Sequence, residues 1–207
     1  MYSTLVHSVA PLHAAQSAVI LLHGRGSSGQ QISRLSEAFD APNVAYLAPS
    51  AEGGSWYPQR FLAPLDANQP ALRNALGQVE QLVQEVLSSG IPVSRLGLIG
   101  FSQGACLALE HASHAGRPYG FVAGLSGALI GPLETKRSDR PLNGLPVYVG
   151  CAKEDAHIPL PHVELTIRHL KAQGAQVTGE LFPGDAHQVF PSEIEWINKQ
   201  LTASKSR

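Results

Sequence analysis

The sequence contains the residue types that nucleophilic catalysis by a serine requires. Ser102 lies in the stretch Gly100-Phe101-Ser102-Gln103-Gly104, which fits the pattern G-x-S-x-G. In that pattern a sharp turn between a strand and a helix exposes the serine hydroxyl. A serine hydroxyl is a weak nucleophile, so it needs a histidine that takes its proton and a carboxylate that orients the histidine.

His187 and Asp155 are the candidates for these two roles. His187 lies in PGDAHQVF, and Asp155 lies in CAKEDAHIP, each directly after an expected strand. Glu154 is the nearest rival to Asp155. Asp185 is closer to His187 in the sequence, but in PGD it is typical of a turn. Three residues at the ends of three different strands, in the order Ser102, Asp155 and His187, therefore predict a nucleophile, an acid and a base.

A second serine, Ser126, competes with Ser102. It lies in GLSG and also ends an apolar strand, but the following GALIGPLET contains Gly131 and Pro132 and is a poor helix. No helix start would then present an amide beside it. We expect Ser126 to shape the floor of the site.

The turn His23-Gly24-Arg25-Gly26 follows the apolar run AVILL. A loop at such a strand end can donate one backbone N–H to a developing oxyanion, and the residue after the nucleophile donates the other. We expect the N–H groups of Arg25 and Gln103 to form this oxyanion hole. Because the contact of Arg25 is through its backbone, substitution there is expected to be tolerated better than at Ser102.

Strand-like and helix-like segments alternate along the chain. The expected strands are 18–23, 43–48, 95–100, 119–125, 146–150 and 176–182, with a weaker edge strand near 3–9. The expected helices are 69–88, 103–115, 159–173 and 191–202. This alternation predicts an α/β fold with a doubly wound, mostly parallel sheet and helices on both faces, built as one domain over residues 1–207. Loops that follow parallel strands meet at one edge of such a sheet.

With these residues in place, the chain resembles the phospholipase/carboxylesterase family of α/β-hydrolases, which includes bacterial carboxylesterases and acyl-protein thioesterases. The resemblance is carried by LLHGRG, LAPSAEGGSWYP, GFSQGACLALE, GLSG, and HIP followed by GDAH. It implies an α/β-hydrolase fold. It also implies site roles, which are the nucleophile, acid, base and two oxyanion donors at Ser102, Asp155, His187, Arg25 and Gln103.

The chain departs from the family at three places. Many relatives have an aspartate soon after HGxG, where this chain has Ser27-Ser28. Relatives usually have Asp-Pro at the acid, where this chain has Asp155-Ala156, and Ala152 replaces a common glycine. These changes bear on the geometry of the acid loop more than on the chemistry.

Two long segments, 49–68 and 127–145, follow strands and are rich in glycine, proline and polar residues. Aromatic and apolar side chains in the first of them either line the substrate pocket or only pin the loop, because aromatic residues do both. The residues expected in the pocket are Trp56, Tyr57, Phe61 and Leu65. At 207 residues there is little room for a large cap domain.

Composition excludes several classes of function. The net charge is -1 and basic residues are scattered, which argues against nucleic acid as a partner. No apolar run is long enough for stable membrane insertion. The N-terminus has no secretory signal, and Cys106 and Cys151 are expected to be buried free thiols, so we expect a cytoplasmic protein.

We therefore expect a serine hydrolase of carboxylic esters, with thioesters and lysophospholipids also open, which uses no cofactor and no metal. Its expected partner is a small-molecule or acyl ester substrate, and a homodimer is left open. The alternatives are a catalytically inactive hydrolase-fold binding protein and a metal hydrolase. The metal hydrolase depends on nine histidines and on the pair His111-x-x-His114, which has no carboxylate ligand pattern beside it.

Overall fold

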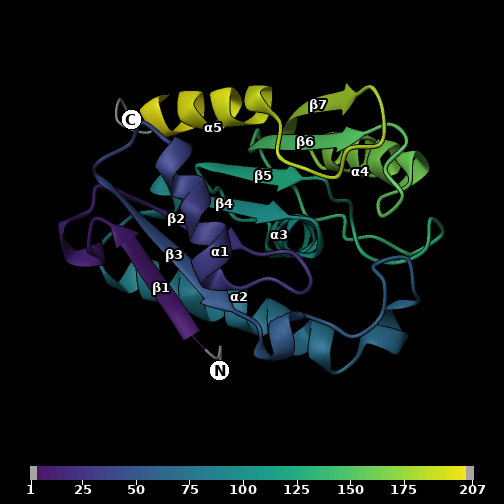
Figure 1. Ribbon diagram of the computed structural model, residues 1–207, viewed down its shortest axis with the longest axis horizontal. Coiled ribbons are helices and arrows are strands. Elements are labelled where there is room, and N and C mark those ends of the chain that lie inside the picture. The colour runs from purple at the N-terminus through teal and green to yellow at the C-terminus, as the bar shows by residue number, and fades with distance from the viewer. Residues whose placement is uncertain (1–3, 204–207) are drawn as a thin grey trace.

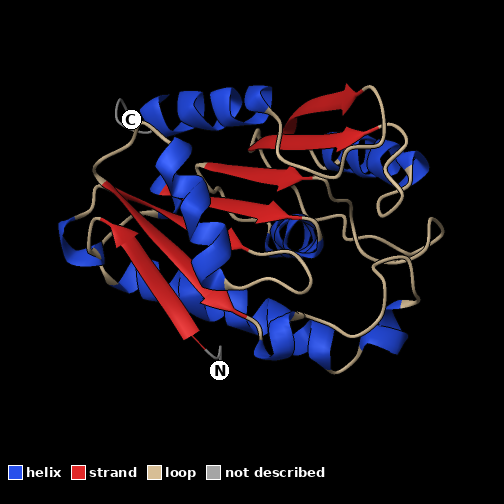
Figure 2. Ribbon diagram, viewed as in Figure 1, coloured by secondary structure: helices blue, strands red, loops and turns tan. Residues whose placement is uncertain are grey.

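The computed structural model describes residues 4–203, which form one twisted sheet with helices on both of its faces (Figures 1 and 2). The strands are β1 Thr4–Val9, β2 Ser17–Leu22, β3 Val44–Ser50, β4 Leu96–Phe101, β5 Phe121–Leu125, β6 Pro146–Ala152 and β7 Gln176–Phe182. The α-helices are α1 Gly29–Ser33, α2 Ala71–Ser88, α3 Gln103–Ala115, α4 Leu160–Ala172 and α5 Pro191–Ala203. None of the described helices has the length and apolar character needed to cross a membrane.

The seven strands lie in the order β1-β3-β2-β4-β5-β6-β7. β2 to β7 are parallel, and β1 pairs antiparallel with β3 at one edge. The mostly parallel sheet predicted from the sequence is confirmed, and the edge strand expected near 3–9 is β1, with residue 3 outside the described residues. Because six strands run the same way, the segments that follow β2, β4, β6 and β7 begin at one edge of the sheet.

The two faces of the sheet bury separate hydrophobic clusters. One cluster packs α2, α3 and α4 against the sheet, and the other packs α5 and part of α1 against the opposite face. The helix expected at 69–88 is α2, and it packs through one apolar stripe, since Leu72, Val79, Val83 and Val86 are all buried. The central strands β2 and β5 are buried at every position, as expected of strands covered on both faces.

Helix α1 is the one element that the sequence patterns did not indicate. It has only five residues, too few for a 3.6-residue periodicity to show. The Ser28 hydroxyl caps it by accepting a hydrogen bond from the Gln31 N–H at 3.3 Å. Gly29 opens it because a Cβ atom there would lie 2.1 Å from the Ala48 carbonyl oxygen of β3.

The long segments 49–68 and 127–145 contain no α-helix, only 3₁₀ turns at Glu52–Gly54 and Leu65–Asn68. They contact each other, because the Gly131 N–H donates to the Phe61 carbonyl at 2.6 Å. Both leave the sheet at its carboxyl edge, and together they build one wall of the region described below.

Both cysteines are free and buried, as the sequence predicted. Burial raises the pKa of the Cys106 thiol to about 12, so this thiol stays protonated and unreactive at neutral pH.

His111 is a buried titratable group on α3. It is 5% exposed, and its Nε2 atom lies 2.8 Å from the Tyr119 hydroxyl. The pKa of His111 is lowered to about 4, mainly by burial; the charge of Glu80 opposes this shift, while the charges of Arg117 and His114 add to it. The folded protein therefore holds this imidazole neutral in conditions where the unfolded chain would protonate it.

This difference predicts a loss of stability in mild acid. The pKa of His111 in the folded protein lies below its value in the unfolded chain. Its contribution to the free energy of unfolding is therefore complete above about pH 6.5 and declines as the pH falls toward 4. One pKa unit corresponds to about 1.4 kcal/mol, so between pH 7 and 4.5 the loss from His111 is about 2 kcal/mol. Urea unfolding should therefore show that the His111→Gln variant loses about 2 kcal/mol less unfolding free energy between pH 7 and 4.5 than the wild type does. The His13→Gln variant, which changes an exposed histidine, should lose as much unfolding free energy as the wild type. Equal losses in the wild type and both variants would contradict the role of His111 in this pH dependence.

Candidate active site

Ser102 lies at the junction between β4 and α3, in a backbone conformation that residues other than glycine rarely adopt. Its φ and ψ angles are 54° and -118°. The Ser102 N–H donates to the Leu125 carbonyl at the end of β5 at 2.9 Å, which anchors the turn to the next strand. Strain of this kind persists only where the surroundings enforce it, and it is common at functional sites.

The two glycines of the motif are required by close approach of the backbone. A Cβ atom at Gly100 would lie 2.1 Å from the Gly104 carbonyl oxygen. A Cβ atom at Gly104 would lie 2.1 Å from the Leu22 carbonyl oxygen at the end of β2. The first turn of α3 can therefore pack against the ends of β4 and β2 only when both positions are glycine.

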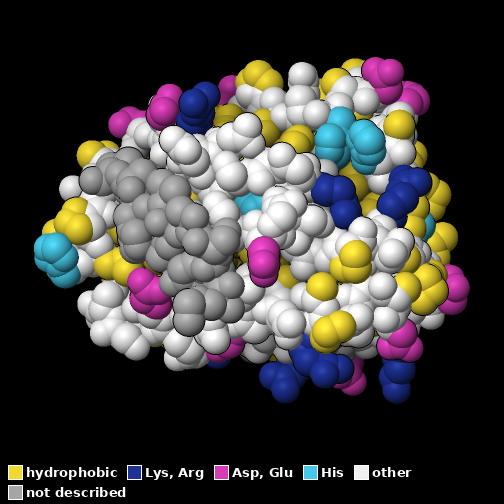
Figure 3. All heavy atoms as spheres, turned by 60° about the horizontal axis from the view of Figure 1, so that its bottom comes forward, with side chains coloured by type: hydrophobic (Ala, Val, Ile, Leu, Met, Phe, Trp, Pro, Cys, Tyr) yellow, Lys and Arg dark blue, Asp and Glu magenta, His cyan; other side chains and the backbone are white. Residues whose placement is uncertain are grey.

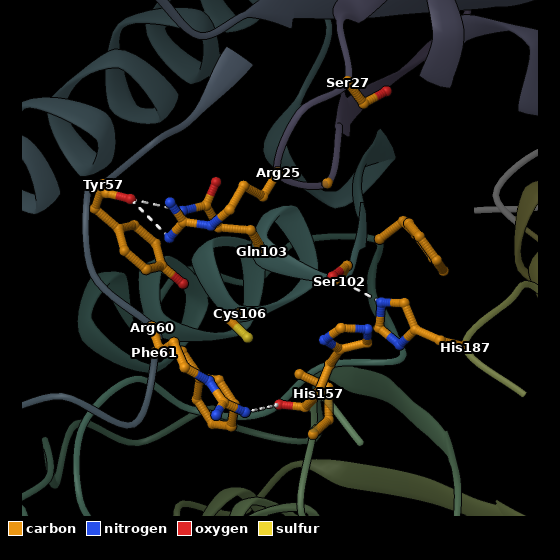
Figure 4. Close-up of a pocket in the computed structure, with 13 residues that line it drawn as sticks. Arg25, Ser27, Tyr57, Arg60, Phe61, Ser102, Gln103, Cys106, His157 and His187 are labelled. Atoms are coloured by element: carbon orange, nitrogen blue, oxygen red, sulfur yellow. Dashed lines mark hydrogen bonds between the residues drawn. The ribbon is translucent and has the colours of Figure 1, made fainter. Parts of the chain in front are cut away.

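The structure brings Ser102, His187 and Asp155 into one chain of hydrogen bonds (Figure 4 shows the serine and the histidine). His187 Nε2 lies 2.8 Å from Ser102 Oγ, and His187 Nδ1 lies 2.7 Å from Asp155 Oδ2. The histidine follows β7 and the aspartate follows β6, so each residue comes from the end of a different strand. This arrangement can transfer the serine proton to the imidazole while the carboxylate fixes the tautomer of the ring.

Asp155 is held as an anion. It is 5% exposed, and its Oδ1 accepts the N–H groups of His157 at 2.8 Å and Ile158 at 3.1 Å. Burial by itself raises the pKa of this carboxyl group, but the hydrogen bonds from His187 and from the two amides outweigh it and hold the pKa below the ordinary value. The loop gives the carboxylate these donors although alanine replaces proline at position 156.

The rival residues lie elsewhere. Glu154 and Asp185 are exposed, and neither has a hydrogen bond to His187 among the described residues. Ser126 is fully buried, and its hydroxyl donates to the Gln188 carbonyl at 3.2 Å. It therefore supports the segment that carries His187 and does not line the cavity beside Ser102.

The turn at His23-Gly24-Arg25 lies against the serine. A Cβ atom at Gly24 would be 3.3 Å from the Ser102 Cβ atom. The Gln103 N–H is the first of α3 and has no acceptor within the helix, and the Arg25 N–H donates to no described backbone acceptor. Both amides are thus available to bind an oxygen atom next to Ser102.

His23 fixes this turn from within the core. It is fully buried, with Nδ1 2.7 Å from the Gly24 carbonyl, while Nε2 accepts the Ala51 N–H at 3.0 Å. Burial lowers the pKa of His23, and the hydrogen bond to Gly24 opposes this shift only in part. Nε2 can accept the Ala51 N–H only while the ring is neutral. Neutral His23 therefore connects the turn at Gly24 to Ala51, which directly follows β3.

The Arg25 side chain forms a second connection, which the sequence did not indicate. Its guanidinium donates to the Ser55 hydroxyl at 3.0 Å and to the carbonyl oxygens of Pro58, Tyr57 and Gln59 at 2.9, 2.9 and 2.6 Å. The backbone is therefore not the only contact of Arg25, and its replacement is expected to affect residues 55–59 as well. The expectation that substitution at Arg25 is tolerated better than at Ser102 stays a prediction.

The Gln103 side chain binds the same segment from the other side. Its Oε1 accepts the Trp56 N–H at 3.0 Å, and its Nε2 donates to the Tyr57 carbonyl at 2.8 Å. The two residues whose amides face Ser102 therefore also hold residues 55–59 with their side chains.

A cavity of about 380 Å³ opens beside Ser102. Figure 3 shows histidine side chains with Lys or Arg side chains next to them at the upper right of one face of the molecule, while others are scattered over the rest of it, and Figure 4 shows the residues that line the cavity. The lining residues are Gly24, Arg25, Ser27, Tyr57, Arg60, Phe61, Phe101, Ser102, Gln103, Cys106, His157, Ile158 and His187.

Two of the four predicted pocket residues, Tyr57 and Phe61, line this cavity. Trp56 instead lies behind its wall, because its indole N–H donates to the His23 carbonyl at 2.8 Å and its ring is 4.9 Å from the His23 ring. Leu65 begins a 3₁₀ turn and packs against the hydrophobic core. For these two residues the structure favours the alternative that an apolar side chain pins the loop.

Sequence reasoning missed several lining residues, among them Arg60, Phe101, His157 and Ile158. His157 and Ile158 follow the acid within the HIP stretch, so their place after β6 was a usable signal. Phe101 is the residue before the serine. Arg60 carried no signal, because its position depends on an irregular segment.

The histidine pair considered as a metal site is placed differently. His111 contacts Tyr119, and His114 Nδ1 lies 3.0 Å from the Glu110 carbonyl of its own helix. Among the residues that the structure describes, no group of three or more His, Cys, Asp or Glu side chains is arranged to hold a metal ion.

A parallel sheet with helices on both faces and a serine on a strained turn between β4 and α3 defines an α/β-hydrolase. The model of the phospholipase/carboxylesterase family matches residues 6–205, and the chain belongs to this family. The crystal structure of a phospholipase/carboxylesterase from Dyadobacter fermentans is similar with a TM-score of 0.91 and 34% identity, covering 97% of both chains.

Two acyl-protein thioesterases are more distant relatives. Acyl-protein thioesterase 1 of Cryptococcus neoformans is 27% identical, over 97% of this chain and 98% of its own length. The crystal structure of Zea mays acyl-protein thioesterase 2 has a TM-score of 0.75 and 24% identity, and the match covers 98% of this chain and 99% of that one.

The four hydrogen bonds of Arg25 predict a measurable structural role. The Arg25→Ala variant should lose on the order of 2 kcal/mol of unfolding free energy, because three carbonyl groups and a hydroxyl each lose one hydrogen bond, and the carbonyls of Pro58 and Gln59 lose their donor among the described residues. For a domain of this size that is a drop in Tm of about 4–8 °C. Arg25→Lys should recover little, since an ammonium group cannot reproduce the planar fork. The exposed Arg73→Ala variant is the control, and an equal Tm for all four proteins would refute this role.

Proposed function

We propose that this chain is a cofactor-independent serine hydrolase of carboxylic esters that uses Ser102 as its nucleophile. The observation that supports it most directly is the hydrogen-bonded chain Ser102–His187–Asp155 beside a cavity. In this proposal His187 is the general base and Asp155 orients and stabilises its imidazolium form.

The reaction begins when Ser102 Oγ attacks the ester carbonyl carbon and His187 Nε2 takes the hydroxyl proton. The carbonyl oxygen becomes an oxyanion, which accepts the backbone N–H groups of Arg25 and Gln103. Collapse of this intermediate breaks the bond to the alcohol, which leaves with the proton from His187. An acyl-enzyme on Ser102 remains.

In the second half of the reaction, water releases the acyl group from Ser102. His187 takes a proton from the water, whose oxygen attacks the acyl carbon, and the same two amides stabilise the second oxyanion. The acid product then leaves and Ser102 regains its proton from His187. Because Asp155 is ionised, it stabilises the positive charge that forms on His187 in both halves.

Thioesters are the second substrate class of this proposal. The relatives from Cryptococcus neoformans and Zea mays are acyl-protein thioesterases. The proposed steps are the same for a thiolate leaving group. A cavity of about 380 Å³ is near the lower end of the usual range for ligand sites, which favours short acyl groups over long ones.

The Ser102→Ala variant tests the nucleophile. It should fold normally but lose labelling by a fluorophosphonate probe, because no oxygen remains to attack phosphorus. Hydrolysis of p-nitrophenyl butyrate should fall by at least about a thousandfold. The Ser126→Ala variant, which lacks the rival serine, should still be labelled. Labelling that persists without Ser102 would refute the assignment, and a folded wild type without turnover of short esters or thioesters would favour the inactive binding protein.

The Asp155→Asn variant tests the acid. An amide cannot stabilise the imidazolium and favours the wrong tautomer of His187, so kcat should fall by about 10³–10⁴-fold. The exposed Glu154→Gln and Asp185→Asn variants are matched controls and should keep kcat within about threefold of the wild type, because surface changes of this kind are usually small. A loss in either control as large as that in Asp155→Asn would contradict the assignment of Asp155.

A further inference from the structure

Tyr57 places a polar group at the wall of the cavity. Its side chain is 1% exposed, and its hydroxyl has no hydrogen-bond partner among the described residues. Figure 4 shows this hydroxyl directed toward Cys106 and the interior of the cavity. The Cys106 thiol is a weak hydrogen-bonding group, so it satisfies the hydroxyl poorly.

An unpaired buried hydroxyl destabilises the fold, and the position of this one on the cavity indicates a role in binding. Burial raises the pKa of Tyr57 well above its ordinary value, so the group keeps its proton and acts as a donor. A ligand that brings an oxygen acceptor to this hydroxyl would recover the lost hydrogen bond.

Arg60 brings a positive charge to the same cavity. Its guanidinium lies 3.4 Å from the carbonyl oxygens of Ala156 and His157, and no carboxylate lies within 4 Å of it in the described part of the chain. Figure 4 shows it beside Phe61, facing His157 across the cavity. The segment that carries it is fixed by Asn68, whose side chain donates to the Arg60 carbonyl at 3.3 Å and accepts the Gln59 N–H at 2.8 Å.

The remaining wall does not neutralise this charge. None of the described residues that line the cavity is Asp or Glu, while Arg25 and Arg60 are both among them. Phe61, Cys106 and Ile158 supply apolar surface between the polar groups and Ser102. The cavity thus combines apolar contact for a short chain with hydrogen-bond donors and uncompensated positive charge.

From this combination we propose that the preferred substrates are half-esters of short dicarboxylic acids, in which the acyl chain ends in a carboxylate. Apolar side chains contact the methylene groups, Tyr57 donates a hydrogen bond to an oxygen of the chain, and Arg60 attracts its negative charge. The inference rests on the proposed hydrolase function and specifies which class of acyl chain the cavity prefers.

Three ethyl esters with the same five-carbon acyl chain separate these contributions. Ethyl pentanoate is apolar, ethyl 4-oxopentanoate adds a neutral acceptor, and monoethyl glutarate adds a carboxylate. Proton release in a pH-stat gives kcat/KM for each, and substrate discrimination is measured by the ratios. The wild type should hydrolyse monoethyl glutarate with a kcat/KM about 5- to 30-fold above that of ethyl pentanoate, and 0.5 M salt should reduce this preference.

The variants assign the preference to residues. Arg60→Gln should reduce the ratio of glutarate to oxopentanoate by about fivefold, mainly through KM, and Arg60→Lys should recover part of it because the charge returns. Tyr57→Phe should reduce the ratio of oxopentanoate to pentanoate by about threefold or more. Arg73→Gln, which changes an exposed arginine outside the cavity, should leave every ratio unchanged.

The outcomes distinguish this inference from the function on which it rests. If Arg60 or Tyr57 only supports the loop, its replacement will lower kcat/KM for all three esters equally, and unchanged ratios will refute that residue's role in selection. A wild type that prefers ethyl pentanoate refutes the proposed substrate class while the hydrolase function stands. Failure to hydrolyse any of the three esters, with no labelling of Ser102, refutes the function itself.

Discussion

The contact between the first turn of α3 and the ends of β4 and β2 is the constraint on which the rest of the site depends. Without side chains at Gly100 and Gly104, the backbone of the helix can lie against the strand ends, where a Cβ atom would be 2.1 Å from a carbonyl oxygen. This approach forces Ser102 to φ 54° and directs its hydroxyl away from the sheet. The same approach leaves the Gln103 N–H at the exposed start of the helix, next to the serine. One backbone contact therefore positions both the hydroxyl and an amide donor.

The irregular segments are held by residues of this same region. His23, Arg25 and Gln103 each use a polar side chain to bind the segment after β3, through Ala51, residues 55–59 and Trp56. That segment carries Tyr57, Arg60 and Phe61 into the cavity. Since the groups beside Ser102 also hold the wall of the cavity, a change in one of them affects both the geometry near the nucleophile and the shape of the cavity. The geometry beside Ser102 and the shape of the cavity are thus coupled through a small number of hydrogen bonds.

The sequence predicted the repeating elements well because they follow simple rules. Buried parallel strands are continuous apolar runs, α2 shows a helical stripe, and turns after strands meet at one edge, so Ser102, Asp155 and His187 could be expected near one another from chain order alone. The five-residue helix α1 and the cavity wall follow no periodicity. Arg60 and Trp56 lie only four residues apart in one irregular segment, yet one lines the cavity and the other packs behind it. That difference is decided by hydrogen bonds to distant residues such as His23 and Asn68, which no local pattern encodes.

The charges around the site divide into two groups with different consequences. Asp155 is buried and accepts hydrogen bonds from two backbone amides besides His187, so its negative charge is stabilised within the protein and lies directly against the histidine. Arg25 directs its charge to neutral carbonyl groups, and Arg60 has only distant carbonyl contacts, so neither positive charge is cancelled by a carboxylate among the described residues. Because none of the described residues that line the cavity is Asp or Glu, the charge of Arg60 favours a negatively charged group within the cavity. In the proposed reaction the backbone N–H groups of Arg25 and Gln103 bind the oxyanion, whereas the Arg60 side chain acts on the acyl chain. Stabilisation of the oxyanion and selection of the substrate would therefore come from different groups, which separate variants can perturb one at a time.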